Sequence, residues 1–284
     1  MISKLQTPKR LNIVHRKRLI QVFENIDQYK LVAVTAGAGY GKTTLVMDAL
    51  SHQNIIPVWY RLDEQDTDFQ VFISYLYSAI RHHFPRTNEI GTNGIDKPEP
   101  APKIGLKKQT ESLLEWLAFA EREIIDPTVF VLDDYHLVQD NAQINAAIEF
   151  ILERLADYIH IIIIGRRNLK LKVSALRARE ELVELNENDL SFTTDEVGTF
   201  FTQSLGLTQS HIRDIHSTTG GWAASLVLLR YAFKKKTPDV IADNLALFRQ
   251  TPETIFSYLK ETIFDPQPDH IKTFMMKAAL LPEI

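Results

Sequence analysis

The 284-residue sequence contains no cysteine, which excludes disulfide bonds and metal sites built on thiolates. Its longest apolar stretches are only as long as a β-strand, and no signal peptide precedes them. The net charge is -4, a balance that disfavours a protein whose main task is to hold nucleic acid. We therefore expect a cytoplasmic protein that neither enters a membrane nor binds DNA through this chain.

A glycine-rich segment at residues 36–44, Ala-Gly-Ala-Gly-Tyr-Gly-Lys-Thr-Thr, follows the apolar run 31–34. It matches a P-loop with alanine in place of the usual first glycine, and its glycines allow backbone N–H groups to point at a phosphate chain. Lys42 can reach the outer phosphates, the Thr43 hydroxyl can hold Mg²⁺, and a helix beginning near Gly41 adds its positive end. The segment predicts a nucleoside triphosphate site. Its predicted contacts are Ala38, Gly39, Tyr40, Gly41, Lys42, Thr43 and Thr44.

Five short apolar runs, bounded by turns or charges, predict β-strands that alternate with segments of helical periodicity. Strands that are apolar on both faces and alternate with helices imply a parallel sheet with helices on both faces. We therefore predict an α/β P-loop NTPase fold with a five-stranded sheet. The predicted strands are 30–35, 57–62, 128–133, 159–165 and 181–185, and predicted helices among them are 68–84, 109–124 and 141–156.

The strand patterns stop after about residue 190, which predicts a second, all-helical region. A capping box at Thr193–Glu196 starts its first helix. Before it, the proline- and glycine-rich residues 86–106 predict a flexible loop at the edge of the sheet. The final helix stops almost at the chain end, so it is either the first element of another domain or an ordinary C-terminal helix. The predicted helices are 194–204, 208–218, 222–235, 238–248, 251–263 and 269–281.

Two carboxylates, Asp133 and Asp134, end the apolar strand 128–133. Asp133 would hold Mg²⁺ through water, opposite Thr43. Asp134 would lie near the γ-phosphate, where it can orient or deprotonate the attacking water. Strands commonly end in aspartate at turns, and Asp134 could also be a plain helix cap. The P-loop upstream favours the metal and catalytic roles.

Arg166 follows the strand 159–165, which in this type of sheet lies between the P-loop strand and the strand of Asp133. A permanently charged guanidinium at that edge would face the γ-phosphate and stabilise transition-state charge. Arg167 is the competing candidate, and one of the two is expected to be a surface or salt-bridge arginine. The predicted catalytic residues are therefore Lys42, Asp134 and Arg166.

Six segments share their order with one known family: Val14–Leu19, Ala38–Thr44, Trp59–Glu64, Asp133–His136, Leu190–Thr193 and Gly221–Ala224. Together they resemble the MalT-type, LuxR-family ATP-binding transcriptional regulators, which are signal-transduction (STAND) P-loop ATPases. The similarity spans essentially the whole chain. It implies a nucleotide-binding domain of the ASCE class followed by a helical domain. It also implies a switch in which ADP holds a closed monomer, whereas inducer and ATP open the protein for self-association.

The resemblance also implies contacts for the base and boundaries for the domains. It places Val14 and Arg16 over the adenine, and Gly221, Trp222 and Ala223 against the base or ribose. Ala223 stands where the family usually has proline, and a helix start with a buried tryptophan would give the same residues. The implied domains are a nucleotide-binding domain at 1–189 with an adenine-side segment at 1–29, a helical lid at 190–264, and the start of a winged helix at 265–284.

The expected function is a regulatory switch that binds ATP or ADP with Mg²⁺ and resets a transcriptional activator through weak ATPase activity. Family members continue into an inducer-sensing superhelix and a C-terminal helix-turn-helix. Neither follows here, so we expect an N-terminal fragment or a short relative. A metabolic P-loop kinase and an AAA-type ring ATPase are the alternatives. A kinase would need an arginine-rich lid and an acceptor pocket, and beyond Arg166, Arg167, Arg177 and Arg179 the sequence shows no such cluster.

Overall fold

The chain divides into two compact units, Met1–Leu190 and Ser191–Ile284, which we describe separately. None of the helices described is long and apolar enough to cross a membrane. The computed structural model describes residues 2–8, 14–84, 106–202, 207–233, 236, 240–241, 243–244, 257 and 260–280.

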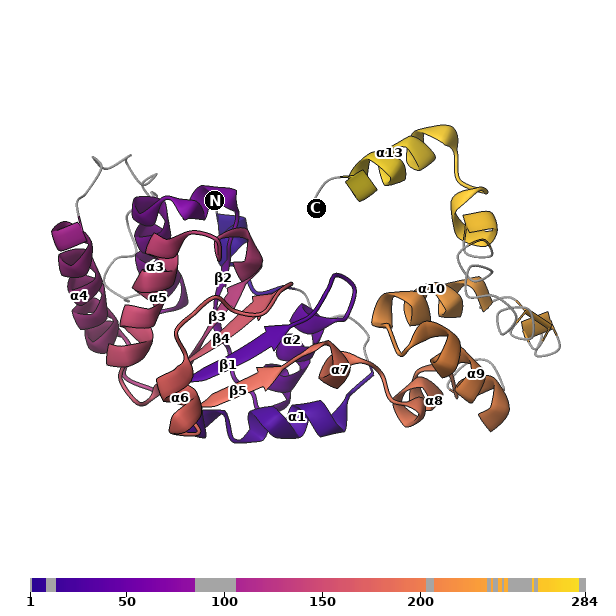
Figure 1. Cartoon of the computed structure of the whole chain (residues 1–284), viewed down its shortest axis with the longest axis horizontal. Coiled ribbons are helices and arrows are strands. Elements are labelled where there is room, and N and C mark those ends of the chain that lie inside the picture. The colour runs from indigo at the N-terminus through magenta and orange to yellow at the C-terminus, as the bar shows by residue number, and fades with distance from the viewer. Residues whose placement is uncertain are drawn as a thin grey trace. The chain divides into compact units, whose positions relative to one another are not determined.

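A five-stranded, all-parallel sheet with strand order β2-β3-β4-β1-β5 forms the centre of the first unit (Figure 1). The five predicted strands are confirmed, each to within one residue at either end, and β4 lies between β3 and β1 as predicted. Because all strands are parallel, their carboxyl ends share one edge of the sheet. The strands are β1 (Leu31–Thr35), β2 (Val58–Arg61), β3 (Thr128–Asp133), β4 (Ile159–Gly165) and β5 (Leu182–Leu185).

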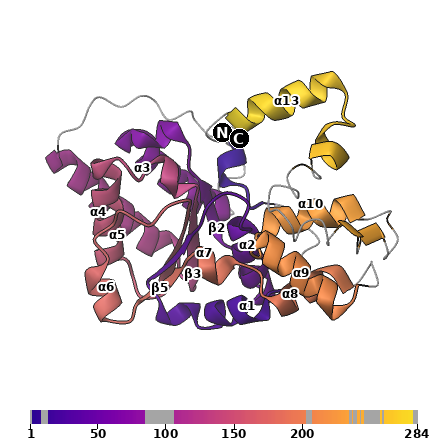
Figure 2. The ribbon, with the colours of Figure 1, turned by 45° about the vertical axis from the view of Figure 1, so that its right-hand side comes forward.

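Alternate residues of the strands enter two separate apolar clusters, one on each face of the sheet. In β1, for example, Leu31 packs with α3 (Phe69–His83), α4 (Leu106–Glu123) and α5 (Ala142–Arg154), whereas Val32 packs with α1 (Lys17–Glu24) and α2 (Lys42–His52). Figure 2 shows α3, α4 and α5 on one side of the sheet and α1 on the other. The continuous burial of β1, β3 and β4 therefore follows from helices on both faces.

The three helices predicted between the strands correspond to α3, α4 and α5 and are confirmed. The predicted loop 86–106 lies outside the described residues except for Leu106, which begins α4, so this helix starts three residues earlier than predicted. Helix α1 was not predicted. The remaining short elements of this unit are η1 (Ile2–Leu5), η2 (Ile26–Gln28), η3 (Glu64–Thr67), η4 (Tyr135–Leu137), α6 (Ser174–Ala178) and α7 (Glu187–Leu190).

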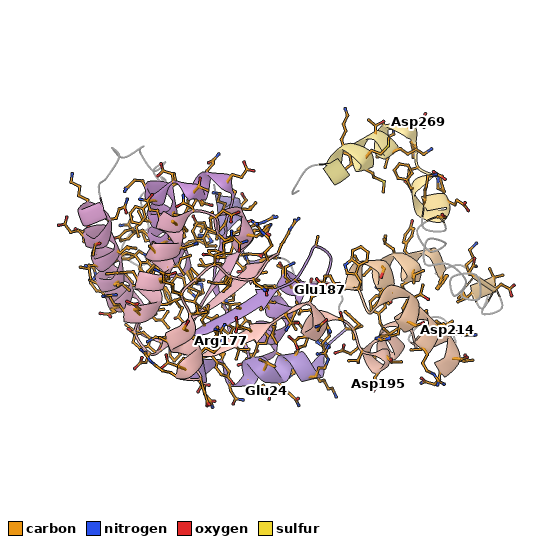
Figure 3. The ribbon with its side chains drawn as sticks, viewed as in Figure 1. Glu24, Arg177, Glu187, Asp195, Asp214 and Asp269 are labelled. Atoms are coloured by element: carbon orange, nitrogen blue, oxygen red, sulfur yellow. The ribbon has the colours of Figure 1, made fainter. Side chains whose placement is uncertain are left out.

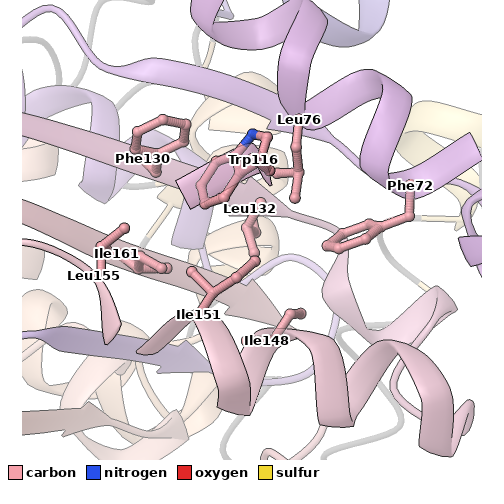
Figure 4. A pocket seen from close by; sticks show the side chains of 9 residues that line it. All are labelled: Phe72, Leu76, Trp116, Phe130, Leu132, Ile148, Ile151, Leu155 and Ile161. Carbon is pink, nitrogen blue, oxygen red and sulfur yellow. The ribbon is translucent and has the colours of Figure 1, made fainter. Parts of the chain in front are cut away.

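A small cavity of about 10 Å³ lies between the sheet and α3, α4 and α5 (Figure 4). All of its lining side chains are apolar or aromatic, and such a volume barely holds one water molecule, which would find no hydrogen-bond partners there. This cavity is therefore part of the packed core and does not suit a polar ligand. The lining residues are Phe72, Leu76, Trp116, Phe130, Leu132, Ile148, Ile151, Leu155 and Ile161.

The second unit is helical in all of its described segments. Its capping box is confirmed, because the Thr193 N–H donates to Glu196 Oε2 at 2.9 Å and the Glu196 N–H donates to Thr193 Oγ1 at 3.3 Å. The predicted helices 194–204, 208–218, 222–235 and 269–281 are confirmed over their described residues. Residues 203–204, 234–235 and 281, and most of 238–248 and 251–263, lie outside the described part of the chain. The elements are α8 (Thr194–Thr202), α9 (Gln209–Thr219), α10 (Ala223–Phe233), a π-helical turn η5 (Lys260–Phe264) and α13 (Asp269–Leu280).

The turn between α9 and α10 contains two glycines in left-handed backbone, and only one of them is crowded. Gly221 has φ +73°, and a Cβ there would lie 2.3 Å from the Phe192 carbonyl oxygen. We expect Gly221→Ala to lower the free energy of unfolding of this unit by about 2 to 3 kcal/mol, because strain and a backbone clash add. Gly220→Ala is the matched control, since Gly220 has φ +58° and open space around it. It should cost only about 1 kcal/mol. Denaturant unfolding measures both, and equal losses would contradict the packing described.

Candidate nucleotide-binding site

The turn from β1 into α2 carries the P-loop at the carboxyl edge of the sheet. Gly39 and Gly41 adopt φ values of 76° and 75°, and Gly41 is the N-cap of α2. Only glycine adopts such angles without strain, so these two positions of the motif are fixed by the backbone. Gly37 has no positive φ, and a Cβ there would make ordinary contacts of 3.7 Å. The loop therefore presents backbone N–H groups and the positive end of an 11-residue helix to one place.

Lys42 lies under this loop, where its Nζ donates hydrogen bonds of 2.8 Å to the carbonyl oxygens of Ala36 and Gly37. Burial, and next the charge of Arg166, lower the pKa of the Lys42 ammonium. A phosphate anion would reverse that balance, because an opposite charge at short range favours the ionised amine. The nearby carboxylates that also favour the ammonium are those of Asp133, Asp134 and Glu187.

Thr43 and Asp133 lie together as predicted for a metal site, with Thr43 Oγ1 at 3.3 and 3.2 Å from the two carboxylate oxygens. Burial, and next the charge of Asp134, raise the pKa of Asp133 from 3.8 to about 6. The ionised carboxylate therefore destabilises the folded unit progressively as the pH rises from about 4 to 6, and a divalent cation would offset that cost. A hydroxyl and a carboxylate are ligands that suit Mg²⁺.

The remaining Mg²⁺ ligands would have to come from phosphate and water. No group of three or more His, Asp or Glu side chains in the described part of the chain is arranged to hold a metal. Mg²⁺ in nucleotide sites is typically bound by one or two protein oxygens and by the phosphates, which fits Thr43 and Asp133. Their assignment as metal ligands stays a prediction.

Asp134 makes an ion pair that the sequence did not reveal. Its Oδ2 accepts a 2.8 Å hydrogen bond from Arg61 Nε, and its own N–H donates to Asp133 Oδ1 at 3.0 Å. Asp134 occupies the N-cap position of η4 with φ +59° but makes no side-chain cap bond, so the helix-cap alternative is wrong. Arg61 is in register with Asp133 at the end of β2. Its place at the end of a predicted strand is the signal that could have pointed to it.

The two arginines after β4 have different surroundings. Arg167 Nη2 donates to Asp140 Oδ2 at 3.0 Å, and Lys170 binds the other oxygen of the same carboxylate at 2.6 Å. Arg167 is therefore the surface salt-bridge arginine. The charge of Arg166, in contrast, acts on Lys42. The structure thus brings Lys42, Thr43, Asp133, Asp134 and Arg166 to one region of the sheet edge.

The N-terminal segment predicted to cover the adenine makes contacts within the first unit. Arg16 is 5% exposed, and its Nη1 donates to the Leu190 carbonyl oxygen at 2.7 Å. His15 Nδ1 lies 2.9 Å from the buried carboxylate of Asp48 on α2, and Val14 is half-buried. The guanidinium of Arg16 therefore joins α1 to α7. The predicted adenine contacts of Val14 and Arg16 stay predictions.

Other predicted contacts fall in the second unit. Gly221 is buried, and Trp222 and Ala223 are half-buried at the start of α10. The Trp222 N–H donates to the Thr219 carbonyl oxygen at 3.1 Å, which fits the interpretation as a helix start. Their contact with a base or ribose stays a prediction.

Tyr40, the one large side chain of the P-loop motif, contacts an acidic residue that the sequence did not identify. Its hydroxyl donates to Glu187 Oε1 at 2.7 Å. Burial, and next this hydrogen bond, raise the pKa of Tyr40 to about 12. Glu187 begins α7, directly after β5, and is labelled in Figure 3. An acidic side chain therefore borders the phosphate loop.

Comparison with curated sequences matches the chain to MalT regulators of several bacteria, whereas no family model matches the chain. The chain is 30% identical over 290 residues to the HTH-type transcriptional regulator MalT of Vibrio cholerae serotype O1. It is 29% identical over 287 residues to MalT of Vibrio campbellii and 30% identical over 285 residues to MalT of Cronobacter sakazakii. Each match covers 98% of this chain and 30% of the relative. The chain thus spans less than a third of the length of these regulators.

Solved structures are less similar to this chain than the MalT sequences are. Cdc6p from Pyrobaculum aerophilum is 17% identical with a TM-score of 0.48, covering 95% of this chain and 74% of that one. The FIGL-1 AAA domain in complex with ADP is 10% identical with a TM-score of 0.46, covering 96% and 91%. The fold assignment rests instead on the strand order, the P-loop and the paired aspartates. The resemblance found in the sequence is confirmed: the chain has a P-loop NTPase fold and is, over nearly its whole length, a homologue of the MalT-type transcriptional regulators.

Proposed function

We propose that this chain is the nucleotide-dependent switch module of a transcriptional regulator, which binds ATP or ADP with Mg²⁺ and hydrolyses ATP slowly to reset the switch. One observation carries the proposal. Lys42, the Thr43–Asp133 pair and Asp134 meet at the carboxyl edge of the sheet in a homologue of MalT regulators. That edge is where ligands of parallel sheets bind.

Each residue has a distinct part in this function. The N–H groups of the P-loop and the Lys42 ammonium would hold the phosphates, whereas Thr43 and Asp133 would hold Mg²⁺. The cation would neutralise charge on the phosphates. Asp134 would orient or deprotonate the attacking water, and Arg166 would stabilise the charge that develops on the transferred phosphoryl group.

The ion pair with Arg61 supports slow rather than fast hydrolysis. A carboxylate oxygen that already accepts a hydrogen bond from a guanidinium is less available to a water molecule than a free one. The pair also turns one Asp134 oxygen toward β2, at 2.8 Å from Arg61 Nε. Asp134 must share or break this contact before it can serve a water molecule at the γ-phosphate. A low resting rate suits a switch, because the ATP state must persist long enough to act.

The helical region 190–264 is proposed as the lid over the nucleotide, and 265–284 as the start of a winged helix. The longer regulator would be cytoplasmic, and it would self-associate in the ATP state. Promoter binding would belong to parts of the regulator outside this chain. These roles follow from the resemblance to the MalT regulators. The curated relatives are about three times longer than the region that matches this chain.

Nucleotide analysis and turnover measurements test the proposed function. ADP should co-purify with the chain or bind it tightly, and Mg·ATP should be hydrolysed more slowly than about one turnover per minute, as in unassisted switch GTPases. Rapid phosphoryl transfer to a metabolite would identify a kinase and overturn the proposal. Fast turnover by ATP-driven hexamers would instead identify a ring ATPase.

A further inference from the structure

The Tyr40–Glu187 pair places a negative charge beside the phosphate loop. One carboxylate oxygen of Glu187 accepts the Tyr40 hydrogen bond at 2.7 Å. The other faces Gly37, since a Cβ on Gly37 would lie 3.7 Å from Glu187 Oε2. Glu187 is also among the charges that act on Lys42. A phosphate chain in the loop would therefore lie within Coulombic reach of this carboxylate.

Helix α7 is held at both of its ends, by contacts of different kinds. At its start, Glu187 binds the P-loop through an exposed hydrogen bond. At its end, the fully buried Leu190 accepts the 2.7 Å hydrogen bond from Arg16. Leu190 is also the last residue of the first unit. The segment that leads out of this unit is thus attached directly to the phosphate loop, and its exposed attachment is the one that an anion can disturb.

We propose that Glu187 opposes nucleotide binding, and that bound nucleotide in turn breaks the Tyr40–Glu187 hydrogen bond and loosens the start of α7. The two effects share one coupling free energy, because linkage between two sites is reciprocal. The inference rests on the proposed function, since it requires a nucleotide in the P-loop. It adds a route by which occupancy of that loop reaches the boundary with the second unit.

The affinity test uses a variant that keeps the hydrogen bond and removes only the charge. Glu187→Gln retains an amide oxygen that can accept from the Tyr40 hydroxyl. It should bind ADP and ATP about 3- to 10-fold more tightly than wild type, and the difference should shrink as salt rises. Glu24→Gln, at an exposed position near the end of α1 (Figure 3), removes the same charge away from the P-loop and should leave affinity unchanged.

The structural test follows hydrogen exchange in α7. The Asn188 N–H is bonded to Asn186 Oδ1 and the Leu190 N–H to the Asn186 carbonyl oxygen, at 2.9 and 3.0 Å. In the wild type, exchange of these amides should rise when ADP binds. In Tyr40→Phe, which keeps the ring but cannot make the bond, exchange should already be fast without ADP and should change little with it.

The possible outcomes distinguish a failure of this coupling from a failure of the proposed function. If wild type binds nucleotide in a way that depends on Lys42, but Glu187→Gln binds no more tightly or α7 exchange does not rise, the coupling is wrong and the nucleotide site stands. If wild type binds neither ADP nor ATP, the proposed function itself fails. Equal tightening in Glu24→Gln would show an effect of net charge and would also overturn the coupling.

Discussion

Replacing Lys42 with alanine should lower the affinity for ATP and ADP by about a thousandfold while the chain stays folded. A hydrogen bond between charged groups contributes about 1.5 to 3 kcal/mol, and this ammonium is positioned to reach two phosphates. Among the described residues, its Nζ bonds to two carbonyl oxygens of the loop, at 2.8 Å. Ala36 is buried and Gly37 half-buried, and the space that the Lys42 side chain leaves lets water replace the lost donor.

Titration calorimetry with Mg·ADP and Mg·ATP measures the effect, and thermal unfolding without nucleotide checks the fold. Lys30→Ala is a matched control, because Lys30 precedes β1 at the opposite edge of the sheet and pairs with the exposed Asp157 at 3.1 Å. It should bind nucleotide as wild type does. A folded Lys42→Ala protein with unchanged ATP affinity would remove the basis for a nucleotide site here.

Asp134→Ala should lose ATP hydrolysis by about a hundredfold or more and keep ATP binding within about threefold, because a positioned general base contributes at least that much to the rate. The geometry separates its role from that of its neighbour. Asp133 contacts Thr43 at 3.2 Å, whereas Asp134 is bonded to Arg61 at 2.8 Å. Asp133→Ala should therefore weaken Mg²⁺-dependent binding, and Asp134→Ala should act on turnover.

Single-turnover assays at saturating Mg·ATP measure the loss of hydrolysis, and calorimetry measures binding in parallel. Asp140→Ala provides a control, since it removes an exposed carboxylate bonded to Arg167 and Lys170 and should leave both quantities unchanged. If Asp134→Ala abolished binding instead, Asp134 would have to be counted among the metal ligands. Wild-type turnover in the variant would remove it from the catalytic residues.

The sheet was predictable because its information is local. Strands β3 and β4 match the predictions residue for residue, since each is a mostly apolar run, broken in β4 only by His160, that ends at an aspartate or a glycine. Helix α1 was missed because it spans eight residues and buries only Leu19, Ile20 and Phe23. An apolar face this short cannot be recognised by its periodicity in a segment rich in basic residues.

The contacts around the site were not predictable from local patterns. Arg61 and Asp134 are 73 positions apart, and Tyr40 and Glu187 are 147 positions apart. Each pair meets because of strand register, the first through β2 on β3 and the second through β5 beside β1. A P-loop and an aspartate pair can be recognised in the sequence, whereas the partners that restrain them depend on which strands become neighbours.

The bond between Arg16 and Leu190 joins two residues 174 positions apart and ties the start of α1 to the end of the first unit. One side chain therefore closes a loop of chain that contains all five strands. Sequence added after residue 190 is attached at a single point and need not thread through the sheet. Segments of different length after residue 190 would therefore leave the strand order of the first unit unchanged.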